Sequence, residues 1–287
     1  MPENVMVNNM AGDEQQMQKP KLTFDARLFL ASARMARAVI KTVFRRVFEE
    51  HKGAEYSTFE YNARKDFVSR FPGGIEVRGK RVLDLGCGKG GETVGYAEED
   101  PSLIVGVEID EQYVRQAAAY AGEKLPGRPV AFVLADAAKM PFADASFDVI
   151  VSHDVFEHLS EPQRVLEECR RVLVPGGRMY LSFGPLWYSP YGGHVVYFSP
   201  VPWSHLLVPE KTMFRARSRF RDDGARSYKE AGVCKMTLKR FERLLDRCDM
   251  KVVFIERRAV KNLKVLVRIP VVRELFCQEV RCVLQCT

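Results

Sequence analysis

The sequence has little that would place this protein in a membrane or direct it out of the cell. No apolar run approaches the ~20 residues that a helix needs to cross a bilayer. The first 20 residues are rich in polar side chains and contain no apolar segment of the kind found in secretory signals. We therefore expect a cytoplasmic protein whose residues 1–20 form a disordered tail.

The cysteines are also poorly placed for a disulfide framework or a metal site. There are seven, an odd number, and no two of them have CxxC spacing, although Cys277, Cys282 and Cys286 cluster along the chain. We expect most of them to be reduced thiols, as in cytosolic proteins. The sequence predicts no metal centre, and Cys87 is interpreted as a small side chain that fits a glycine-rich turn.

The chain does contain one stretch around which the rest is organised, RVLDLGCGKGG at residues 81–91. Its apolar start predicts a buried parallel strand, and its glycines predict a tight turn in which the backbone can approach a ligand. A helix expected over 93–98 would point its free N–H groups at this turn. The pattern indicates a nucleotide-type site in a doubly wound sheet, with a tight turn that binds nothing as the alternative.

Four further apolar runs follow the first one at regular intervals. They lie at 103–109, 130–135, 147–152 and within 171–183. Glu108 stands near the end of the second run, 24 residues after Asp84, roughly the interval at which an acid binds ribose hydroxyls. Asp136 follows the third run, and HDVFEHL follows the fourth. Strands that alternate with helices in this way predict a parallel sheet with helices on both faces.

Four segments together resemble one family, the class I S-adenosylmethionine-dependent methyltransferases of the small-molecule type. They are DLGCGKG, VGVEID, LADAAKMPFADASFDVIVSHDVFEHL and RRVLVPGGRMYLSF, in the family's order and spacing over about residues 80 to 185. The resemblance implies an α/β fold with a doubly wound, seven-stranded, mostly parallel Rossmann-like sheet. It also implies N-terminal helices, a cap insertion after the fifth strand and a final antiparallel pair of strands.

The organisation expected along the chain follows from this resemblance. The predicted parts are a disordered tail (1–20), an N-terminal helical cover (21–79), an S-adenosylmethionine-binding core (80–185), a substrate cap insertion (186–235) and a C-terminal part of the core (236–287). Helical patterns predict a long helix over 22–51 and a second over 57–71, capped by Ser57 or Thr58. The last part is predicted to contain a helix over 237–248 capped by Thr237, strands over 251–260 and 279–285, and a helix over 263–276 interrupted at Pro270.

The resemblance implies S-adenosylmethionine as the cofactor and assigns its site. The implied cofactor-binding residues are Asp84, Gly86, Gly88, Gly90, Glu108, Ile109, Asp136, Ala137 and His153. Asp84 would orient the methionine ammonium, to which His153 would offer its backbone carbonyl. Glu108 would accept from both ribose hydroxyls, because a carboxylate can accept two hydrogen bonds. Asp136 would accept from the adenine amino group, with Met140 against the ring.

Residues 186–235 interrupt the strand–helix alternation and are rich in aromatic side chains. Because they follow the fifth strand, at the edge of the sheet where ligands bind, we predict a substrate cap there. Its predicted substrate contacts are Trp187, Tyr188, Tyr191 and Trp203; the alternative is an aromatic mini-core that stabilises the insertion. His194 is the first candidate for a general base and His158 the second, because an imidazole titrates near cytosolic pH. Tyr56, Tyr61 and Arg64 are candidates for a lid over the cofactor.

Positive charge is concentrated in two places. The helical pattern over 22–51 alternates apolar with basic residues, and 211–243 contains eleven Lys or Arg against four Asp or Glu. Solvated basic faces explain both patterns. The alternatives are peripheral contact with an anionic membrane, a partner protein, or RNA.

The function predicted from the resemblance is methyl transfer to a small-molecule or lipid-linked acceptor, most simply at oxygen, with nitrogen and carbon left open. One alternative is RNA methylation, but SHDVF replaces the Asn/Asp-Pro-Pro-aromatic motif after the fourth strand, so no stable nucleic-acid partner is expected. The other alternative is a non-catalytic S-adenosylmethionine-binding scaffold, since a fold does not fix a function. The sequence does not indicate an oligomeric state.

Overall fold

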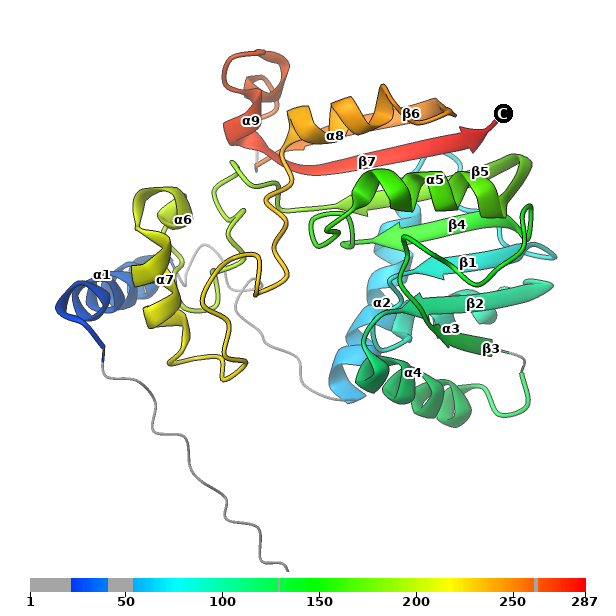
Figure 1. Cartoon of the computed structure of the whole chain (residues 1–287), viewed down its shortest axis with the longest axis horizontal. Helices are drawn as coiled ribbons and strands as arrows, with labels where there is room; N and C mark the ends of the chain where they lie inside the picture. Colours follow the sequence, from blue (N-terminus) through cyan, green and yellow to red (C-terminus); the bar gives the residue numbers. More distant parts are fainter. Residues whose placement is uncertain (1–21, 41–53, 129, 261–262) are drawn as a thin grey trace, which may run out of the picture.

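A seven-stranded sheet forms the centre of the protein in the computed structural model, which describes residues 22–40, 54–128, 130–260 and 263–287 (Figure 1). The strands follow the order β3-β2-β1-β4-β5-β7-β6. They are β1 (Arg81–Leu85), β2 (Leu103–Glu108), β3 (Val130–Leu134), β4 (Phe147–His153), β5 (Leu173–Phe183), β6 (Met250–Ala259) and β7 (Cys277–Cys286). The first five pair in parallel, and β7 runs antiparallel to both β5 and β6. The predicted doubly wound sheet with a final antiparallel pair is confirmed.

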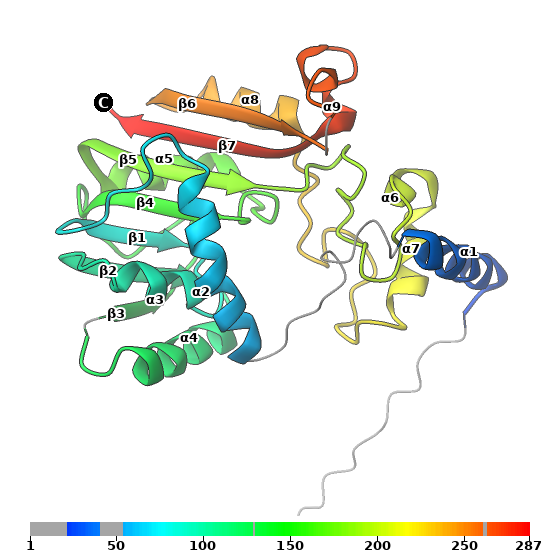
Figure 2. The same ribbon diagram turned by 180° about the vertical axis from the view of Figure 1, so that it is seen from behind.

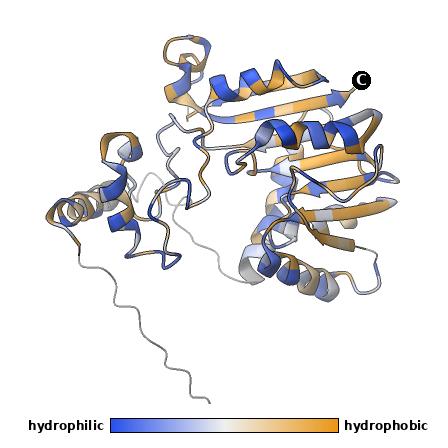
Figure 3. Ribbon diagram, viewed as in Figure 1, coloured by the Kyte–Doolittle hydropathy of each residue, from blue (hydrophilic) through white to orange (hydrophobic). Residues whose placement is uncertain are grey.

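Helices cover both faces of this sheet, as expected for buried parallel strands. One face carries α2 (Ala54–Ser69) and α3 (Gly91–Ala97), with α4 (Glu111–Lys124) beside α3. The other carries α5 (Pro162–Val172) and α8 (Leu238–Leu245). Figure 3 shows the hydrophobic colour along the central strands, whereas α8 alternates hydrophobic and hydrophilic residues. None of the helices in the described ranges is long and apolar enough to cross a membrane.

Local signals in the sequence set several helix boundaries. The Asp110 carboxylate accepts from the N–H groups of Gln112 and Tyr113, which caps α4. Thr237 caps α8 as predicted, because its hydroxyl accepts from the N–H of Arg240. Pro162 occupies the first turn of α5, where a missing N–H costs nothing.

Two predicted boundaries are wrong. Helix α2 begins at Ala54, so Ser57 lies inside it, and the Ser57 hydroxyl donates to the carbonyl of Lys89 at 3.2 Å instead of capping the helix. The helix predicted over 263–276 is interrupted around Pro270 as predicted, but it is shorter, with a 3₁₀ turn at Leu266–Arg268 and a short α9 (Arg273–Phe276). Pro270 explains this interruption, since proline lacks an N–H and disfavours helical backbone in the residue before it.

The N-terminal helical cover predicted over 21–79 is divided between two parts of the molecule. Helix α2 packs on α3 beside the sheet, whereas α1 (Phe24–Ile40) lies against α7 (Glu210–Arg217) in the cap (Figure 2). Leu30 of α1 joins a buried apolar cluster with Met213 and Phe214 of α7. The predicted helix positions 41–51 and the predicted disordered tail over 1–20 lie outside the described residues.

The cap after β5 contains α7, a short α6 (Ser204–Leu207) and irregular segments. Its apolar side chains form a separate cluster from those of the sheet, and Trp187, Tyr197 and Phe198 contribute to it. The chain returns from this cap to α8, and the strand pair β6–β7 then completes the edge of the sheet next to β5.

Candidate functional site

A cavity of about 480 Å³ lies where the strands β1, β2 and β4 end, between the glycine turn and helix α2. Parallel strands present their carboxyl ends at one edge of a sheet, which is where ligands bind in folds of this type. Seven of the nine predicted cofactor-binding residues line it: Gly86, Gly88, Glu108, Ile109, Asp136, Ala137 and His153. The cavity therefore brings together residues from four separate stretches of the sequence.

The glycine turn has positive φ at Gly86 (73°), Gly88 (52°) and Gly90 (79°), a conformation that favours glycine. A Cβ at Gly86 would lie 2.5 Å from a methyl group of Val155, and one at Gly88 would lie 2.8 Å from Glu60 Oε1. Gly90 has a different role, because a Cβ there would lie 2.7 Å from that of Ala117. Gly86 and Gly88 shape the cavity, whereas Gly90 lets the turn pack against helix α4.

Asp84 lies behind the cavity lining, with only 5% of its surface exposed. The Thr93 hydroxyl donates to its Oδ2 at 2.5 Å. Burial, followed by the nearby charge of Glu92, raises the pKa of Asp84 to about 7. This carboxylate stabilises the start of α3 beneath the turn, and its predicted contact with an ammonium stays a prediction.

Glu108 is fixed at the end of β2 by backbone donors. Its Oε1 accepts from the N–H groups of Ile109 at 2.8 Å and Asp110 at 3.1 Å, and its Oε2 accepts from Gly88 at 3.1 Å. A carboxylate has about four lone-pair positions, so Oε2 keeps acceptor capacity toward the cavity. The side chain is thus held in place and can still bind a hydroxyl group.

Asp136 and Ala137 line the cavity after β3. The Ala138 N–H donates to Asp136 Oδ1 at 2.9 Å, which holds the loop in a turn. Met140 does not follow the prediction that it packs against an adenine ring, because its side chain is 4% exposed and belongs to the core cluster of the sheet.

The side chain of His153 forms a buried polar network in addition to the predicted use of its carbonyl. Its Nδ1 lies 2.5 Å from Glu92 Oε1 and its Nε2 lies 3.0 Å from Arg70 Nη1, while Phe67 stacks on the ring at 4.6 Å. Burial alone would lower the pKa of His153, but the charges of Asp154 and Glu92 outweigh it and raise the pKa to about 9. The network fixes the end of β4 beside the glycine turn.

Sequence reasoning missed three acids of the cavity, Glu60, Glu92 and Asp154. Glu60 reaches the turn from α2, where its Oε2 accepts from the Gly91 N–H at 3.3 Å, and burial raises its pKa to about 8. Glu92 had a local signal, since it directly follows the last glycine in the first turn of α3. Glu60 had none, because only the packing of α2 on α3 brings it to the cavity.

Of the three residues predicted to form a lid over the cofactor, one lines the cavity and two do not. Tyr56 lines the cavity, and Lys89 Nζ lies 5.2 Å from the centre of its ring. Tyr61 donates instead to Glu98 at 2.6 Å, and Arg64 pairs with Glu99. Of the three candidates, only Tyr56 is placed to cover a ligand, and the other two join α2 to α3.

The charges in the cavity are mainly negative. Its lining acids are Glu60, Glu92, Glu108, Asp136 and Asp154. Aromatic side chains of Tyr56, Phe59 and Tyr113 add apolar surface, which suits a ring stacked near the entrance. A ligand that combines a sulfonium, an ammonium, a ribose and an adenine fits this set of acids and aromatic rings.

The predicted substrate residues lie in the cap and not in the lining of this cavity. Trp187 packs edge-on against His205 and Tyr228, both with ring centroids 4.9 Å away. The Trp203 indole N–H donates to the carbonyl of Tyr188 at 3.0 Å. Trp187 therefore contributes to the aromatic mini-core, and contacts of Tyr188, Tyr191 and Trp203 with a substrate stay predictions.

The two predicted catalytic histidines lie close together at the junction of cavity and cap. His158 lines the cavity, and its ring centroid lies 5.1 Å from that of His194. Burial, reinforced by the nearby His158, lowers the pKa of His194 to about 3. His194 is therefore neutral at physiological pH and a weak proton acceptor, and its role as a general base stays a prediction.

The sheet order, the glycine turn and the acid at the end of β2 define a Rossmann-like nucleoside-binding protein. The family described as "Methyltransferase domain" matches residues 83–181. These residues are a class I S-adenosylmethionine-dependent methyltransferase domain, as the sequence motifs predict. S-adenosylmethionine is the cofactor of this class, and the cavity residues fit it.

Relatives in sequence agree with this assignment. The 27-O-demethylrifamycin SV methyltransferase of Amycolatopsis mediterranei (strain S699) is 34% identical over 48% of this chain and 51% of its own. The O-methyltransferase cnsE of Penicillium expansum is 34% identical over 37% of this chain and 38% of its own. The chain thus spans about half or less of the length of these relatives.

An S-adenosylmethionine-dependent methyltransferase from Mesorhizobium loti has a similar fold, with a TM-score of 0.51 and 20% identity. The match covers 79% of this chain and 97% of that one. At this level of identity the likeness concerns the fold alone.

Proposed function

We propose that this protein transfers a methyl group from S-adenosylmethionine to a small-molecule or lipid-linked acceptor, at an oxygen atom. The observation that carries the proposal is Glu108, whose carboxylate is held by three backbone N–H groups at the mouth of an acidic cavity beside the glycine turn. The names of two relatives, which methylate oxygen, support the choice of atom. Nitrogen and carbon acceptors are the alternatives.

Methyl transfer is an in-line displacement in which the acceptor oxygen bonds to the methyl carbon while the carbon–sulfur bond breaks and its electron pair stays on sulfur. The chain has to bind the donor, align the acceptor and take away the hydroxyl proton. Glu108 and Asp136 would bind the nucleoside, and the Glu92 carboxylate would offset the positive charge of the donor. The cap would position the acceptor over the exposed side of the cavity.

Calorimetry with S-adenosylmethionine and its demethylated product, S-adenosylhomocysteine, tests donor binding. We expect both to bind the full chain, and failure of both to bind would refute the proposal. Incubation of cell extract with isotope-labelled donor, followed by mass spectrometry, then identifies the acceptor. A labelled small molecule or lipid supports the proposal, whereas labelled RNA supports the RNA alternative.

A non-catalytic scaffold is the second candidate. It would bind the donor tightly and produce no labelled compound in any extract.

Membrane contact is a separate proposal for the basic residues of α1 and of 211–243. Part of this charge is already paired, for example Arg217 with Asp223 and Lys235 with Glu210. Flotation with anionic vesicles tests it, and absence of binding would exclude it.

A further inference from the structure

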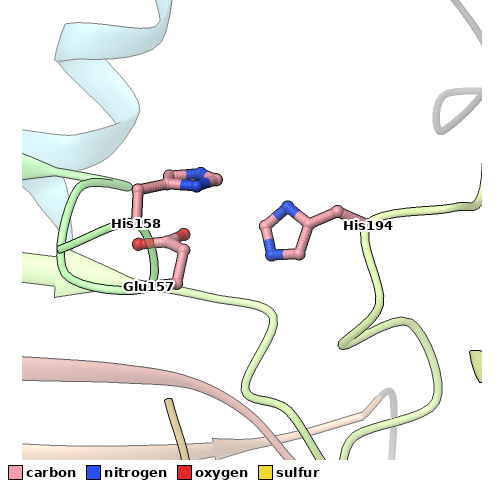
Figure 4. Close-up of side chains that lie close together, drawn as sticks. All are labelled: Glu157, His158 and His194. Atoms are coloured by element: carbon pink, nitrogen blue, oxygen red, sulfur yellow. The ribbon is translucent and has the colours of Figure 1, made fainter. Parts of the chain in front are cut away.

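Three potential metal ligands from two distant segments meet beside the cavity. Glu157 and His158 lie in the loop after β4, and His194 lies in a turn of the cap (Figure 4). One ligand atom from each side chain lies within 4.8 Å of the other two. Figure 4 shows the imidazole of His194 pointing from the cap toward the other two side chains. No local spacing in the sequence indicates this group.

A hydrogen bond to a backbone carbonyl indicates the tautomer of the His158 imidazole. His158 Nδ1 lies 2.8 Å from the carbonyl oxygen of Gly232, which can only accept, so Nδ1 carries the proton. A neutral His158 therefore has its lone pair on Nε2, and a ring that donates from one nitrogen and offers the other is the arrangement found in metal-bound histidines. The Nε2 of His194 is buried and has no hydrogen-bond partner in the described ranges.

Glu157 supplies a third lone pair. Its side chain is 2% exposed, and its Oε1 accepts from the Gly184 N–H at 3.1 Å. Its Oε2 is buried and has no hydrogen-bond partner among the residues that the structure describes. A buried acceptor without a donor is costly. Within the described part of the chain, Oε2 of Glu157 and Nε2 of His194 are thus two buried acceptors without a donor, and His158 offers a third ligand atom within 4.8 Å of one on each of these side chains.

The turn that carries His194 is tightly packed against the rest of the cap. A Cβ at Gly192 would lie 2.2 Å from the carbonyl oxygen of Leu186, and one at Gly193 would lie 2.4 Å from Cβ of His205. Only glycine fits at these two positions, and His194 follows them. The cap thus holds this imidazole against the loop after β4.

We propose that Glu157, His158 and His194 bind a divalent transition-metal ion, for which zinc is the representative example. Two histidines and one carboxylate form a ligand set used for zinc and non-haem iron, with further coordination positions left open. Metal–ligand bonds of about 2.0–2.2 Å require the ligand atoms to approach to roughly 3.3 Å in a tetrahedral site. The present ligand atoms lie within 4.8 Å of one another, so binding an ion would draw them closer together.

The position of the site suggests its use, and this part rests on the proposed function. His158 also lines the donor cavity, so the ion would lie between the donor and the cap. A hydroxyl acceptor bound to the ion would lose its proton to solvent more readily, and its oxygen would then take the methyl group. The ion would thus supply the deprotonation that methyl transfer to a hydroxyl group needs.

Metal binding is tested on the full chain without any acceptor. The protein is stripped with a chelator and titrated with Co²⁺, followed by displacement with Zn²⁺, and metal content is measured by mass spectrometry. We expect about one equivalent of ion and a visible cobalt spectrum without the strong charge-transfer band of a thiolate. Glu157→Gln and His194→Gln should each weaken binding at least tenfold.

His205→Gln is the matched control, since this histidine lies in the same cap and its Nε2 contacts the Trp187 carbonyl instead. It should bind the ion as the unchanged chain does. Binding of S-adenosylhomocysteine by each variant shows that the core is folded, and it separates failure of the metal proposal from failure of the proposed function. Three results would each overturn the assignment: no uptake of Co²⁺ by the unchanged chain, a thiolate spectrum, or variants Glu157→Gln and His194→Gln that bind Co²⁺ as tightly as the unchanged chain.

Discussion

Glu108 is the cavity residue with the most completely defined surroundings. Its substitution by glutamine keeps the shape of the side chain but removes the charge and places an amide donor near backbone donors. We expect Glu108→Gln to weaken S-adenosylhomocysteine binding by about 10- to 100-fold, the range for loss of a charged hydrogen bond. Calorimetry measures this change directly.

Glu111→Gln is the control for this variant, because Glu111 lies in the first turn of α4 and pairs with Arg115 on the surface. It should bind S-adenosylhomocysteine as the unchanged chain does. Equal affinities of Glu108→Gln and Glu111→Gln would show that the β2 carboxylate does not contact the ligand.

Glu60 makes the stability of the ligand-free chain depend on pH. Burial raises its pKa from 4.5 to about 8, so the folded chain keeps a proton that the unfolded chain loses above about pH 4.5. The stabilising contribution is therefore complete at low pH and is lost as the pH rises through 8. Asp84, with a pKa raised to about 7, acts in the same direction.

Glu60→Gln should remove part of this dependence. The free energy of unfolding of the unchanged chain should fall more between about pH 5 and pH 8.5 than that of the variant does. We expect this relative gain of the variant to be on the order of 1–3 kcal/mol. Denaturant unfolding at the two pH values measures the gain, with the exposed Glu123→Gln as the control. A parallel pH profile for Glu60→Gln and the unchanged chain would contradict the buried position of this acid.

At the scale of elements, the glycine turn is the critical connection between β1 and α3. An added Cβ at Gly90 would meet both the Cβ of Ala117 at 2.7 Å and the ring of Phe132 at 3.0 Å, at a φ of 79°. We expect Gly90→Ala to lower the free energy of unfolding by about 2–4 kcal/mol, since strain and overpacking add. Urea denaturation checks this value.

Gly224 provides a comparison with the same backbone conformation and open surroundings. Its φ is 70°, and no atom lies within 4 Å of an added Cβ among the described residues. Gly224→Ala should cost only about 1 kcal/mol, the strain of a positive φ. A loss as large as that of Gly90→Ala would mean that packing against α4 is not what requires glycine at position 90.

At the scale of the whole molecule, the cap and α1 form a unit beside the methyltransferase core. Leu30 is 6% exposed and packs with Met213, which is fully buried. We expect Leu30→Ala to speed hydrogen exchange in α1 and α7, because a cavity of this kind costs about 2–5 kcal/mol. Donor binding should stay unchanged, since the cavity lies in the core.

Leu28→Ala is the matched control on the same helix, where the side chain is 61% exposed. Its exchange rates should equal those of the unchanged chain. Faster exchange throughout the core in Leu30→Ala would show instead that the cap and the core unfold as one unit.

Much of the core was predictable because its signals are local. The strand, glycine turn and helix from Arg81 to Ala97 follow from apolar runs and glycines that are adjacent in the sequence, and the Thr237 cap acts within one helical turn. Seven predicted cofactor-binding residues reach the cavity because parallel strands end at the same edge. The interruption at Pro270 was also predictable, because proline acts on the backbone at its own position and on the residue before it.

Contacts between distant segments were decided only by the tertiary structure. Glu60 reaches the glycine turn because α2 packs on α3, and α1 joins the cap because Leu30 finds its apolar partners on α7. His194 meets Glu157 across 37 positions of the chain because the cap folds back onto the loop after β4. Hydrophobic burial is non-directional, so the sequence determines which faces are apolar, and only the packed chain determines which of them meet.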